Sequence, residues 1–268
     1  MKKCIGMLLA ALLLVTALMP ALAEDTSLDK ILQKGELVLG LDDSFPPMGY
    51  RDENNEIVGF DIDLAREVCV RLGVELKLQP IDWAAKEMEL NSGNIDCIWN
   101  GMSSTPERQE SMACSMDYLN NKIVFLAKDP AIKGREDLVG KRVAVQSGSY
   151  AEEVLEQDAQ YADFYKSLDE VLAYPDYLTA IMDMQNGNVE AVLIDLVVAN
   201  YQMTQIGDDS LFTVDNLSDD LYCVGFRKDD VSLRDKVNEI FKEMAKDGKL
   251  DEISAKWFGE NITLIAAE

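Results

Sequence analysis

The chain is predicted to be an α/β protein, and two observations lead to this class. Segments with the apolar pattern of β-strands take turns along the sequence with segments that have the 3.6-residue period of α-helices. Several of the expected helices also follow a polar loop that ends in a capping Ser, Thr or Asp, as is common where a strand leads into a helix.

The N-terminus is typical of a secretory signal peptide. Two lysines at positions 2–3 precede an apolar run at 5–19, and Ala-Leu-Ala at 21–23 supplies the small residues of a cleavage site. The run is shorter than the roughly 20 residues that a membrane span needs. We therefore expect cleavage after Ala23 and an exported, soluble chain, periplasmic or associated with the cell surface. We also expect no lipid, because Cys4 precedes the apolar run and cannot be the first residue of the mature chain.

The first αβ unit follows the expected cleavage site. Residues 37–41 are predicted to form a short apolar strand, and residues 57–60 a second one. Asp61 is expected to cap the next helix, which Gly73 ends. Residues 74–79 alternate apolar and polar side chains, so they are predicted to form a half-buried strand.

An arginine at a helix start is the most informative feature of the next unit. An apolar strand at 95–99 leads into a polar loop at 100–104, and Thr105 and Pro106 then open a helix. Arg108 lies in the first turn, where a cation opposes the helix dipole. Its position alone favours a solvated surface residue, and the alternative is an arginine aimed at an anion on the same helix start.

A second αβ block contains another polar turn. A strand at 142–146 precedes a Gly-containing turn, and Ser149 with Glu152 has the spacing of a capping box, so a helix begins near Tyr150. Such a turn exposes backbone N–H groups that suit an anion such as a carboxylate.

The last strands place one acid at a sheet edge. An apolar strand at 189–194 ends at Asp195, and the carboxyl ends of parallel strands are where open α/β sheets bind ligands. A loop-capping role is equally compatible with this position. A strand at 221–226 and a polar helix at 233–246 follow.

Composition excludes several classes of function. Without residues 1–23 the chain keeps 245 residues, enough for one large or two modest domains, with a net charge of −26 that would repel nucleic acid and anionic lipid. The absence of histidine rules out Ser-His-Asp and Cys-His catalysis and His-ligated zinc. We expect neither a cofactor nor a metal.

Four cysteines remain after the leader, and their spacings match no zinc pattern; they are Cys69, Cys97, Cys114 and Cys223. An exported chain meets oxidising conditions, so one or two disulfides are compatible with the sequence, without an assigned connectivity. Cys69 lies on the apolar stripe of a helix and is expected to be a buried thiol.

Taken in order, these segments resemble the extracytoplasmic solute-binding proteins for polar amino acids, which are family 3 of the solute-binding proteins of ABC importers. The most specific stretch is GFDIDLAREVCVRL at 59–72. Supporting stretches are LDDSFPPMGY (41–50), GNIDCIWNGMSSTPERQ (93–109), VAVQSGSYAEEV (143–154), GNVEAVLID (187–195), LYCVGFRKDD (221–230) and KWFG (256–259).

The resemblance implies a fold. It is the type II periplasmic-binding-protein fold, with two α/β lobes joined by two hinge strands and a ligand cleft between them. Lobe 1 would hold residues 24–117 and 225–268, and lobe 2 residues 122–220. The hinge strands would be residues 118–121 and 221–224.

The resemblance also implies site residues for the ligand carboxylate. Arg108 matches the family arginine that binds the α-carboxylate, and its planar guanidinium suits two parallel hydrogen bonds. Gly101 and Ser103 match positions that add backbone and hydroxyl contacts to the same group. Ser149 and Tyr150 match the turn of lobe 2 that closes on it.

Four further positions match contacts to the rest of an amino acid. Asp195 matches the acid that holds the α-ammonium. Phe45 and Trp83 match residues that pack on the aliphatic part, although core packing is an alternative for both. Asp42 matches an acid that meets the side-chain end in glutamine- and lysine-binding relatives.

The sequence departs from the family pattern at four positions. Gln146 and Ile194 stand where glutamine-binding relatives carry Lys and His, which leaves the identity of the ligand open. Cys114 stands where an aromatic residue is usual and Cys223 where glycine is usual, which bears on packing or a disulfide.

The predicted function is passive capture of an L-amino acid, polar or basic with glutamine-like favoured, by a monomer that delivers it to the permease of an ABC importer. Arg108 and Asp195 would come from opposite lobes, with no protein partner in the open, ligand-free state. The alternative is a cyclohexadienyl or arogenate dehydratase-like enzyme on the same scaffold, with Asp42 or Asp43 as the acid.

Overall fold

The computed structural model describes residues 25–206 and 210–266. The predicted signal peptide and its cleavage site after Ala23 lie outside the described residues. Within these two ranges no helix has the length and apolar character needed to cross a membrane.

The predicted α/β class is confirmed. The strands are β1 (Glu36–Leu41), β2 (Ser44–Phe45), β3 (Gly49–Arg51), β4 (Ile57–Val58), β5 (Glu75–Pro80), β6 (Cys97–Ser103), β7 (Met112–Cys114), β8 (Leu119–Ala127), β9 (Arg142–Gln146), β10 (Glu170–Tyr174), β11 (Ala191–Asp195) and β12 (Phe212–Arg227). The helices are α2 (Ser27–Lys34), α3 (Phe60–Leu72), α4 (Lys86–Ser92), α5 (Pro106–Ser111), α6 (Tyr150–Gln157), α7 (Ala162–Ser167), α8 (Tyr177–Gln185), α9 (Leu196–Ile206), α10 (Val231–Asp247) and α11 (Lys249–Phe258). Short 3-10 turns are η2 (Trp83–Ala85), η3 (Arg135–Leu138) and η4 (Ala159–Tyr161).

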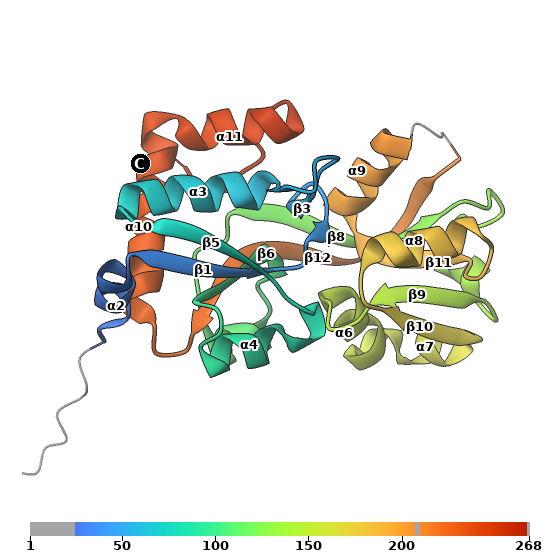
Figure 1. Cartoon of the computed structure of the whole chain (residues 1–268). Coiled ribbons are helices and arrows are strands. Elements are labelled where there is room, and N and C mark those ends of the chain that lie inside the picture. Colours follow the sequence, from blue (N-terminus) through green and yellow to red (C-terminus); the bar gives the residue numbers. More distant parts are fainter. Residues whose placement is uncertain (1–24, 207–209, 267–268) are drawn as a thin grey trace, which may run out of the picture.

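One twisted sheet runs through the whole molecule in the order β10-β9-β11-β8-β12-β6-β1-β5, with β7 paired to β12. The long strands β8 and β12 lie antiparallel in its middle, and each extends into both halves (Figure 1). We call the half with β1, β5 and β6 lobe 1, and the half with β9, β10 and β11 lobe 2. The residue limits assigned to the lobes from the sequence stay a prediction.

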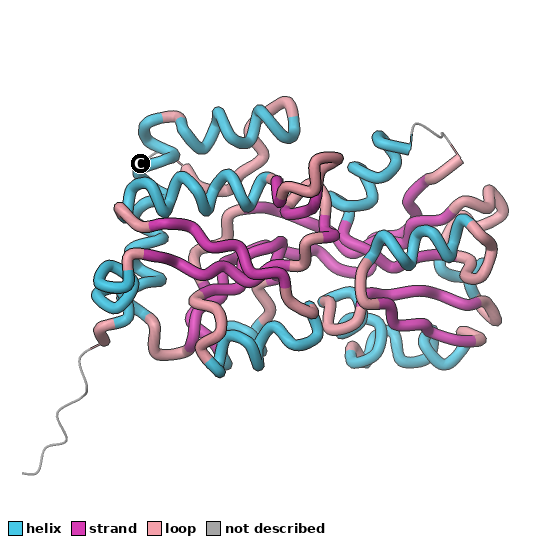
Figure 2. Tube along the Cα trace, viewed as in Figure 1, coloured by secondary structure: helices cyan, strands magenta, loops and turns pink. Residues whose placement is uncertain are grey.

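Helices cover both faces of each half. In lobe 1, α3 and α11 lie above the strands and α4 below them, and in lobe 2 the helices α6 to α9 surround the strands (Figures 1 and 2). The strands β1, β6, β9 and β11 are largely buried, as expected for strands covered by helices on both faces. The last residues of β6, β9 and β11 line one cavity between the halves.

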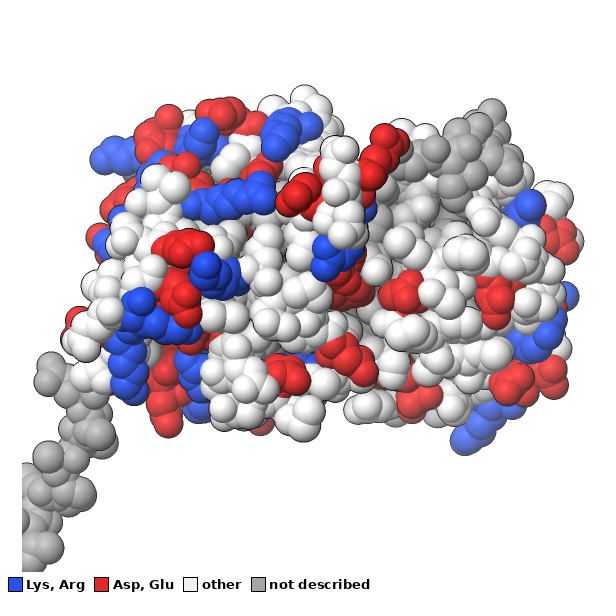
Figure 3. Space-filling view, in the orientation of Figure 1, with Lys and Arg blue, Asp and Glu red and all other residues white. Residues whose placement is uncertain are grey.

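The surface carries the acidic excess that the composition predicts. On the face drawn in Figure 3, Asp and Glu side chains are spread over both halves, and Lys and Arg gather mainly on lobe 1. No continuous basic surface is visible on this face, as a nucleic-acid-binding protein would need.

The four cysteines are free thiols. Cys69 lies on the buried face of α3, as predicted, and its burial raises the pKa of the thiol to about 12. The disulfides that the sequence allows are therefore not formed in this structure.

Three expected element boundaries are wrong. Asp61 does not cap α3, because Gly59 is the N-cap and the Asp61 side chain turns into the core instead. The expected loop at 100–104 is mostly strand, because β6 keeps pairing with β12 as far as Ser103 opposite Tyr222. The strand expected at 221–226 begins much earlier, at Phe212, because its first half pairs with β8.

Asp61 links α3 to β6. Its fully buried carboxylate accepts from the backbone nitrogen of Gly101 at 2.7 Å and from the Tyr118 hydroxyl at 2.9 Å. Gly101 has a φ of +60°, and a Cβ there would lie 2.6 Å from the Phe45 ring. Asp61 therefore fixes a backbone position that only glycine fits. Burial raises the pKa of Asp61 to about 7, although both hydrogen bonds oppose the shift.

We expect Asp61→Asn to flatten the pH dependence of stability. A carboxyl whose folded-state pKa is raised from 3.8 to about 7 stabilises the fold below about pH 4 and loses that contribution as the pH rises through 7. For this one group the loss is at most about 4 kcal/mol. Urea unfolding at several pH values between 4 and 8 measures it. The exposed control Asp29→Asn should keep the wild-type slope, and equal slopes for all three proteins would contradict the account.

Candidate functional site

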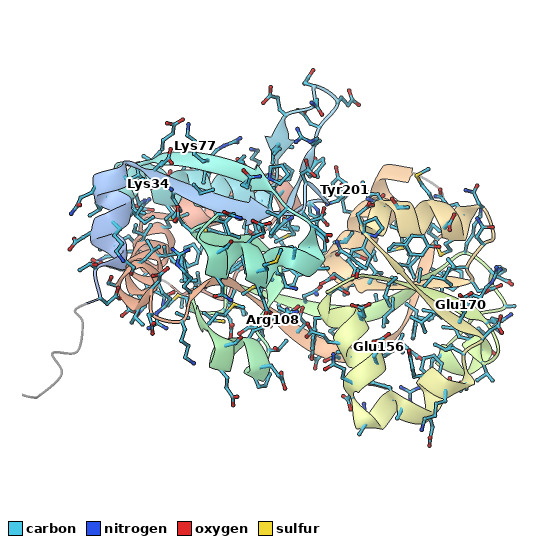
Figure 4. The ribbon with its side chains drawn as sticks, turned by 60° about the horizontal axis from the view of Figure 1, so that its bottom comes forward. Lys34, Lys77, Arg108, Glu156, Glu170 and Tyr201 are labelled. Carbon is cyan, nitrogen blue, oxygen red and sulfur yellow. The ribbon has the colours of Figure 1, made fainter. Side chains whose placement is uncertain are left out.

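A narrow, nearly filled cavity of about 10 Å³ lies where the two lobes meet. Arg108 marks its place at the boundary between the halves in Figure 4. Its lining residues are Phe45, Trp83, Gly101, Ser103, Arg108, Gln146, Ser149, Tyr150 and Asp195. Eight of these nine are site residues that the sequence predicts, and Gln146 is the exception. The remaining predicted residue, Asp42, bonds to Gln146.

Arg108 reaches the cavity from the first turn of α5. Thr105 caps this helix by accepting from the Arg108 backbone nitrogen at 3.2 Å, and Pro106 takes the first helical position, as predicted. The buried guanidinium donates from Nη1 to the Ser103 carbonyl at 3.1 Å and pairs through Nη2 with Glu153 at 2.5 Å. Within the described residues its buried Nε has no acceptor. A solvated surface role is therefore excluded, because a buried guanidinium needs acceptors for its N–H groups.

Glu153 is a site residue that the sequence did not predict. It lies on α6 in lobe 2, one helical turn after Ser149, and reaches across to Arg108 in lobe 1. Arg108 therefore has a protein partner when the lobes are in contact, and its lack of a partner in open lobes stays a prediction. A pair between two elements that are distant in the chain and in separate lobes has no local sequence signal.

The start of α6 forms the lobe 2 side of the cavity. Ser149 caps the helix by accepting from the Glu152 backbone nitrogen at 3.1 Å, as the capping box predicts. The Glu152 carboxylate accepts from the Gly148 nitrogen at 2.6 Å, one residue earlier than a standard box. The Tyr150 hydroxyl bonds with the Ser218 hydroxyl at 2.9 Å. The turn is therefore held by hydrogen bonds within the start of α6 and by one hydrogen bond to β12.

Asp195 ends β11 and is buried on the lobe 2 side. Its Oδ1 accepts from the Tyr222 hydroxyl at 2.6 Å and from Asn121 Nδ2 at 2.7 Å. Burial raises the pKa of the carboxyl, against the effect of these two donors and of the nearby Tyr177 hydroxyl. Both donors come from β8 and β12, far along the chain, so the sequence did not show them. Because both are neutral, they orient the carboxylate without cancelling its charge.

Two aromatic residues form apolar walls of the cavity. Phe45 packs over Gly101 and against Tyr177 of lobe 2, with ring centroids 5.8 Å apart. Trp83 lies in η2, and Lys86 Nζ is 5.2 Å from its ring centroid. Both aromatics are nearly buried and also line the cavity. They can therefore contact an apolar part of a ligand.

Asp42 lies beyond the end of β1, next to the cavity lining. Its Oδ2 accepts from Gln146 Nε2 at 2.6 Å, which connects the two lobes, and its Oδ1 accepts from the Ser44 nitrogen at 2.9 Å. Asn100 Nδ2 donates to the Asp42 backbone carbonyl. Burial raises the pKa of Asp42 to about 6, against the effect of the Gln146 and Ser44 bonds.

Other contacts also hold the lobes together beside the cavity. Lys86 Nζ of lobe 1 donates to the Gly148 carbonyl of lobe 2 at 2.7 Å. Burial, followed by the charge of Arg108, lowers the pKa of Lys86 to about 8. On the opposite side, the hydroxyls of Tyr50 and Tyr201 are 3.0 Å apart, and Tyr201 lies at the junction in Figure 4. The cavity is thus flanked by lobe-to-lobe contacts on both sides.

Known proteins share this architecture. A model of the bacterial extracellular solute-binding proteins of family 3 matches residues 37–260. The L-cystine-binding protein TcyJ of Escherichia coli (strain K12) is 32% identical over 244 residues, or 90% of this chain and 89% of that protein. The arginine-binding extracellular protein ArtP of Bacillus subtilis (strain 168) is 30% identical over 262 residues, or 96% of this chain and 98% of that protein.

A solved structure confirms the two-lobed fold. It is an ABC uptake transporter substrate binding protein from Streptococcus pneumoniae with bound histidine. It superimposes with a TM-score of 0.86 at 36% identity and covers 90% of this chain and 99% of that chain.

Proposed function

We propose that this chain, which belongs to family 3 of the bacterial extracellular solute-binding proteins, captures one L-amino acid outside the cytoplasm and delivers it to the permease of an ABC importer. The observation that carries the proposal is the pair of opposite charges on one cavity, Arg108 from lobe 1 and Asp195 from lobe 2. An α-amino acid is a zwitterion with the complementary charges on adjacent atoms.

The two charged residues would bind the two ends of the zwitterion. Among the described residues no acceptor reaches the buried Arg108 Nε, so it can donate to the α-carboxylate together with a neighbouring N–H. The two Asp195 donors, Tyr222 and Asn121, both reach Oδ1, so Oδ2 would accept from the α-ammonium. Phe45 and Trp83 would pack on the side chain.

The far end of the side chain would meet Asp42 and Gln146. When ionised, Asp42 offers only acceptors, and Gln146 already donates to it. This arrangement favours a side chain that ends in a hydrogen-bond donor, as glutamine, arginine and lysine do. Glutamate should bind worse, because its carboxylate would lie near that of Asp42.

We propose that the cavity binds its ligand and does not transform it. Micromolar affinity requires about −8 kcal/mol. Spread over about ten ligand atoms, this is well inside the limit of about −1.5 kcal/mol per atom, so no reacting group is needed. Incubation with arogenate and prephenate tests the enzymatic alternative, and no ultraviolet-absorbing aromatic product is expected. The chain would act as an exported monomer.

Removing either charge should abolish tight binding. Arg108→Met keeps an apolar stem without the charge, and Asp195→Asn keeps an acceptor for Tyr222 and Asn121. Each leaves one ligand charge without its partner, at a loss of about 3–5 kcal/mol for a buried pair, so affinity should fall by about a hundredfold or more. Titration with the common L-amino acids and L-cystine, followed by tryptophan emission or calorimetry, measures this.

The controls for these variants are exposed residues of the same type. Arg66→Met on α3 and Asp163→Asn on α7 should bind like the wild type, because both side chains lie on the surface away from the cavity. Circular dichroism confirms folding of all four variants. A folded Arg108→Met or Asp195→Asn protein that binds within about threefold of the wild type would contradict the site assignment.

Lobe closure gives a separate test at Gly148. A Cβ at this residue would lie 2.7 Å from the Ala84 Cα of lobe 1, so Gly148→Ala should hold the lobes apart. Gly140→Ala is the matched control, because Gly140 has almost the same φ, +71° against +70°, and no atom within 4 Å of the added Cβ. With saturating amino acid, X-ray scattering should show a larger radius of gyration, and titration at least tenfold weaker binding, for Gly148→Ala only. Identical behaviour of the two variants would exclude this closure contact.

A further inference from the structure

Asp220 is a buried acid beside the ligand cavity that the proposed capture of an amino acid does not use. It lies on β12 directly opposite Asn121 of β8. Its Oδ2 accepts from Asn121 Nδ2 at 2.9 Å and from the Ser103 hydroxyl at 3.0 Å. Ser103 itself lines the cavity, so Asp220 lies one hydrogen bond behind the cavity wall.

The Asn121 amide connects Asp220 to Asp195. The same Nδ2 that donates to Asp220 also donates to Asp195 Oδ1 at 2.7 Å. The Asn121 Oδ1 accepts from the Val197 backbone nitrogen at 3.4 Å, which fixes the orientation of the amide. One neutral NH₂ group therefore serves two buried carboxyl groups at once, and neither carboxyl belongs to an ion pair in the part of the chain that the structure describes.

Two carboxylates in this position repel each other in a medium that screens charge poorly. Both are buried, and the donors that reach them are neutral: hydroxyls of Ser103 and Tyr222, the Asn121 amide and the backbone nitrogen of Leu221. Two such groups favour a form that holds one proton between them. A ligand ammonium at Asp195 supplies a positive charge that offsets the repulsion between the two carboxylates. The proton that they share is then no longer favoured.

We propose that Asp220 is a positioning residue that couples amino-acid capture to the release of one proton. In the free protein Asp195 and Asp220 hold one proton together. When the α-ammonium binds at Asp195, the ammonium keeps its three protons and Asp220 gives its proton to water, so the site gains one negative charge to match the ligand. The inference rests on the proposed function, because the ligand must carry an ammonium group.

Asp220 has a route for this proton that avoids the ligand. It borders a surface groove of about 590 Å³, which residues of β8, β12, the start of α5 and Tyr150 of α6 also line. Lys122 and Asp219 lie at the rim of this groove. A proton released from Asp220 can therefore reach solvent while a ligand fills the cavity.

The groups around Asp220 place the transition near neutral pH. Titratable groups that face it are Asp195 from β11, Tyr150 from α6, Tyr177 from α8 and Tyr222 from its own strand. The pKa values of the three tyrosines are raised, so these side chains stay neutral. Burial, followed by the charge of Asp195, raises the pKa of Asp220 to about 7. Because the free form holds the proton, affinity should rise with pH up to about 7 and level off above it.

Calorimetry tests the coupling directly. The full-length mature protein is titrated with L-glutamine, L-arginine and L-cystine at pH 6.5 in two buffers of different ionisation enthalpy, and dissociation constants are measured between pH 5.5 and 8.5. The wild type should release about 0.8 proton per ligand at pH 6.5 and bind about tenfold more tightly at pH 8 than at pH 6.

Asp220→Asn should remove this linkage. An amide resembles the protonated acid, so the variant should match the wild type within about twofold at pH 5.5 and bind at least fivefold more weakly at pH 8. Asp219→Asn is the matched control, because it removes an exposed charge from the next residue, and it should keep the wild-type pH profile.

The outcomes separate the two proposals. If the wild type binds none of the three amino acids, the proposed function fails. If it binds but releases no proton, or if Asp220→Asn keeps the wild-type pH profile, the role of Asp220 is wrong while amino-acid capture stands. Should Asp220→Asn not fold, the proton count for the wild type decides alone.

Discussion

The pairing of β8 with β12 is the constraint on which the site depends. These antiparallel strands place Leu119 opposite Tyr222 and Asn121 opposite Asp220. The register brings the Tyr222 hydroxyl and the Asn121 amide to the Asp195 carboxylate at the end of β11. A shift by one residue would turn both donors to the other face of the sheet and leave a buried carboxylate without them. Because both strands enter both lobes, the same pairing joins the halves and orients the anionic wall of the cavity.

Arg108 and Asp195 are buried charges whose pairing is incomplete, and this explains why the cavity suits an amino acid. In the part of the chain that the structure describes, the buried Arg108 Nε has no acceptor, and Asp195 has neutral donors only. A buried charge is costly unless it is paired and hydrogen-bonded. Glu153 pairs with one N–H group of Arg108 from across the cavity. The carboxylate of a zwitterion would accept from the remaining Arg108 N–H, and its ammonium would pair with Asp195. Its binding would therefore stabilise contact between the lobes.

The sequence predicted those parts of the protein that have a local signal. Ser149 and Thr105 are recognisable as helix caps from a few neighbouring residues, and both cap as expected. The resemblance to a family identified the other predicted cavity residues, because several motifs in the family's order indicate the family's fold. Gln146 is the lining residue that it did not identify. What the sequence could not show depends on contacts between distant segments. Asp61 looked like a cap and is a buried link to Gly101, and the partnership of Arg108 with Glu153 exists only after two lobes fold and meet.

The central claim is that one zwitterion is held at both charged ends, and ligand chemistry tests it without altering the protein. Calorimetric titration compares the more tightly bound of L-glutamine and L-arginine with two analogues, the amine that lacks the α-carboxylate and the acid that lacks the α-ammonium. The account predicts that each analogue binds at least a hundredfold more weakly, since each leaves Arg108 or Asp195 facing an uncharged atom. Binding of either analogue within about threefold of the parent amino acid would contradict it.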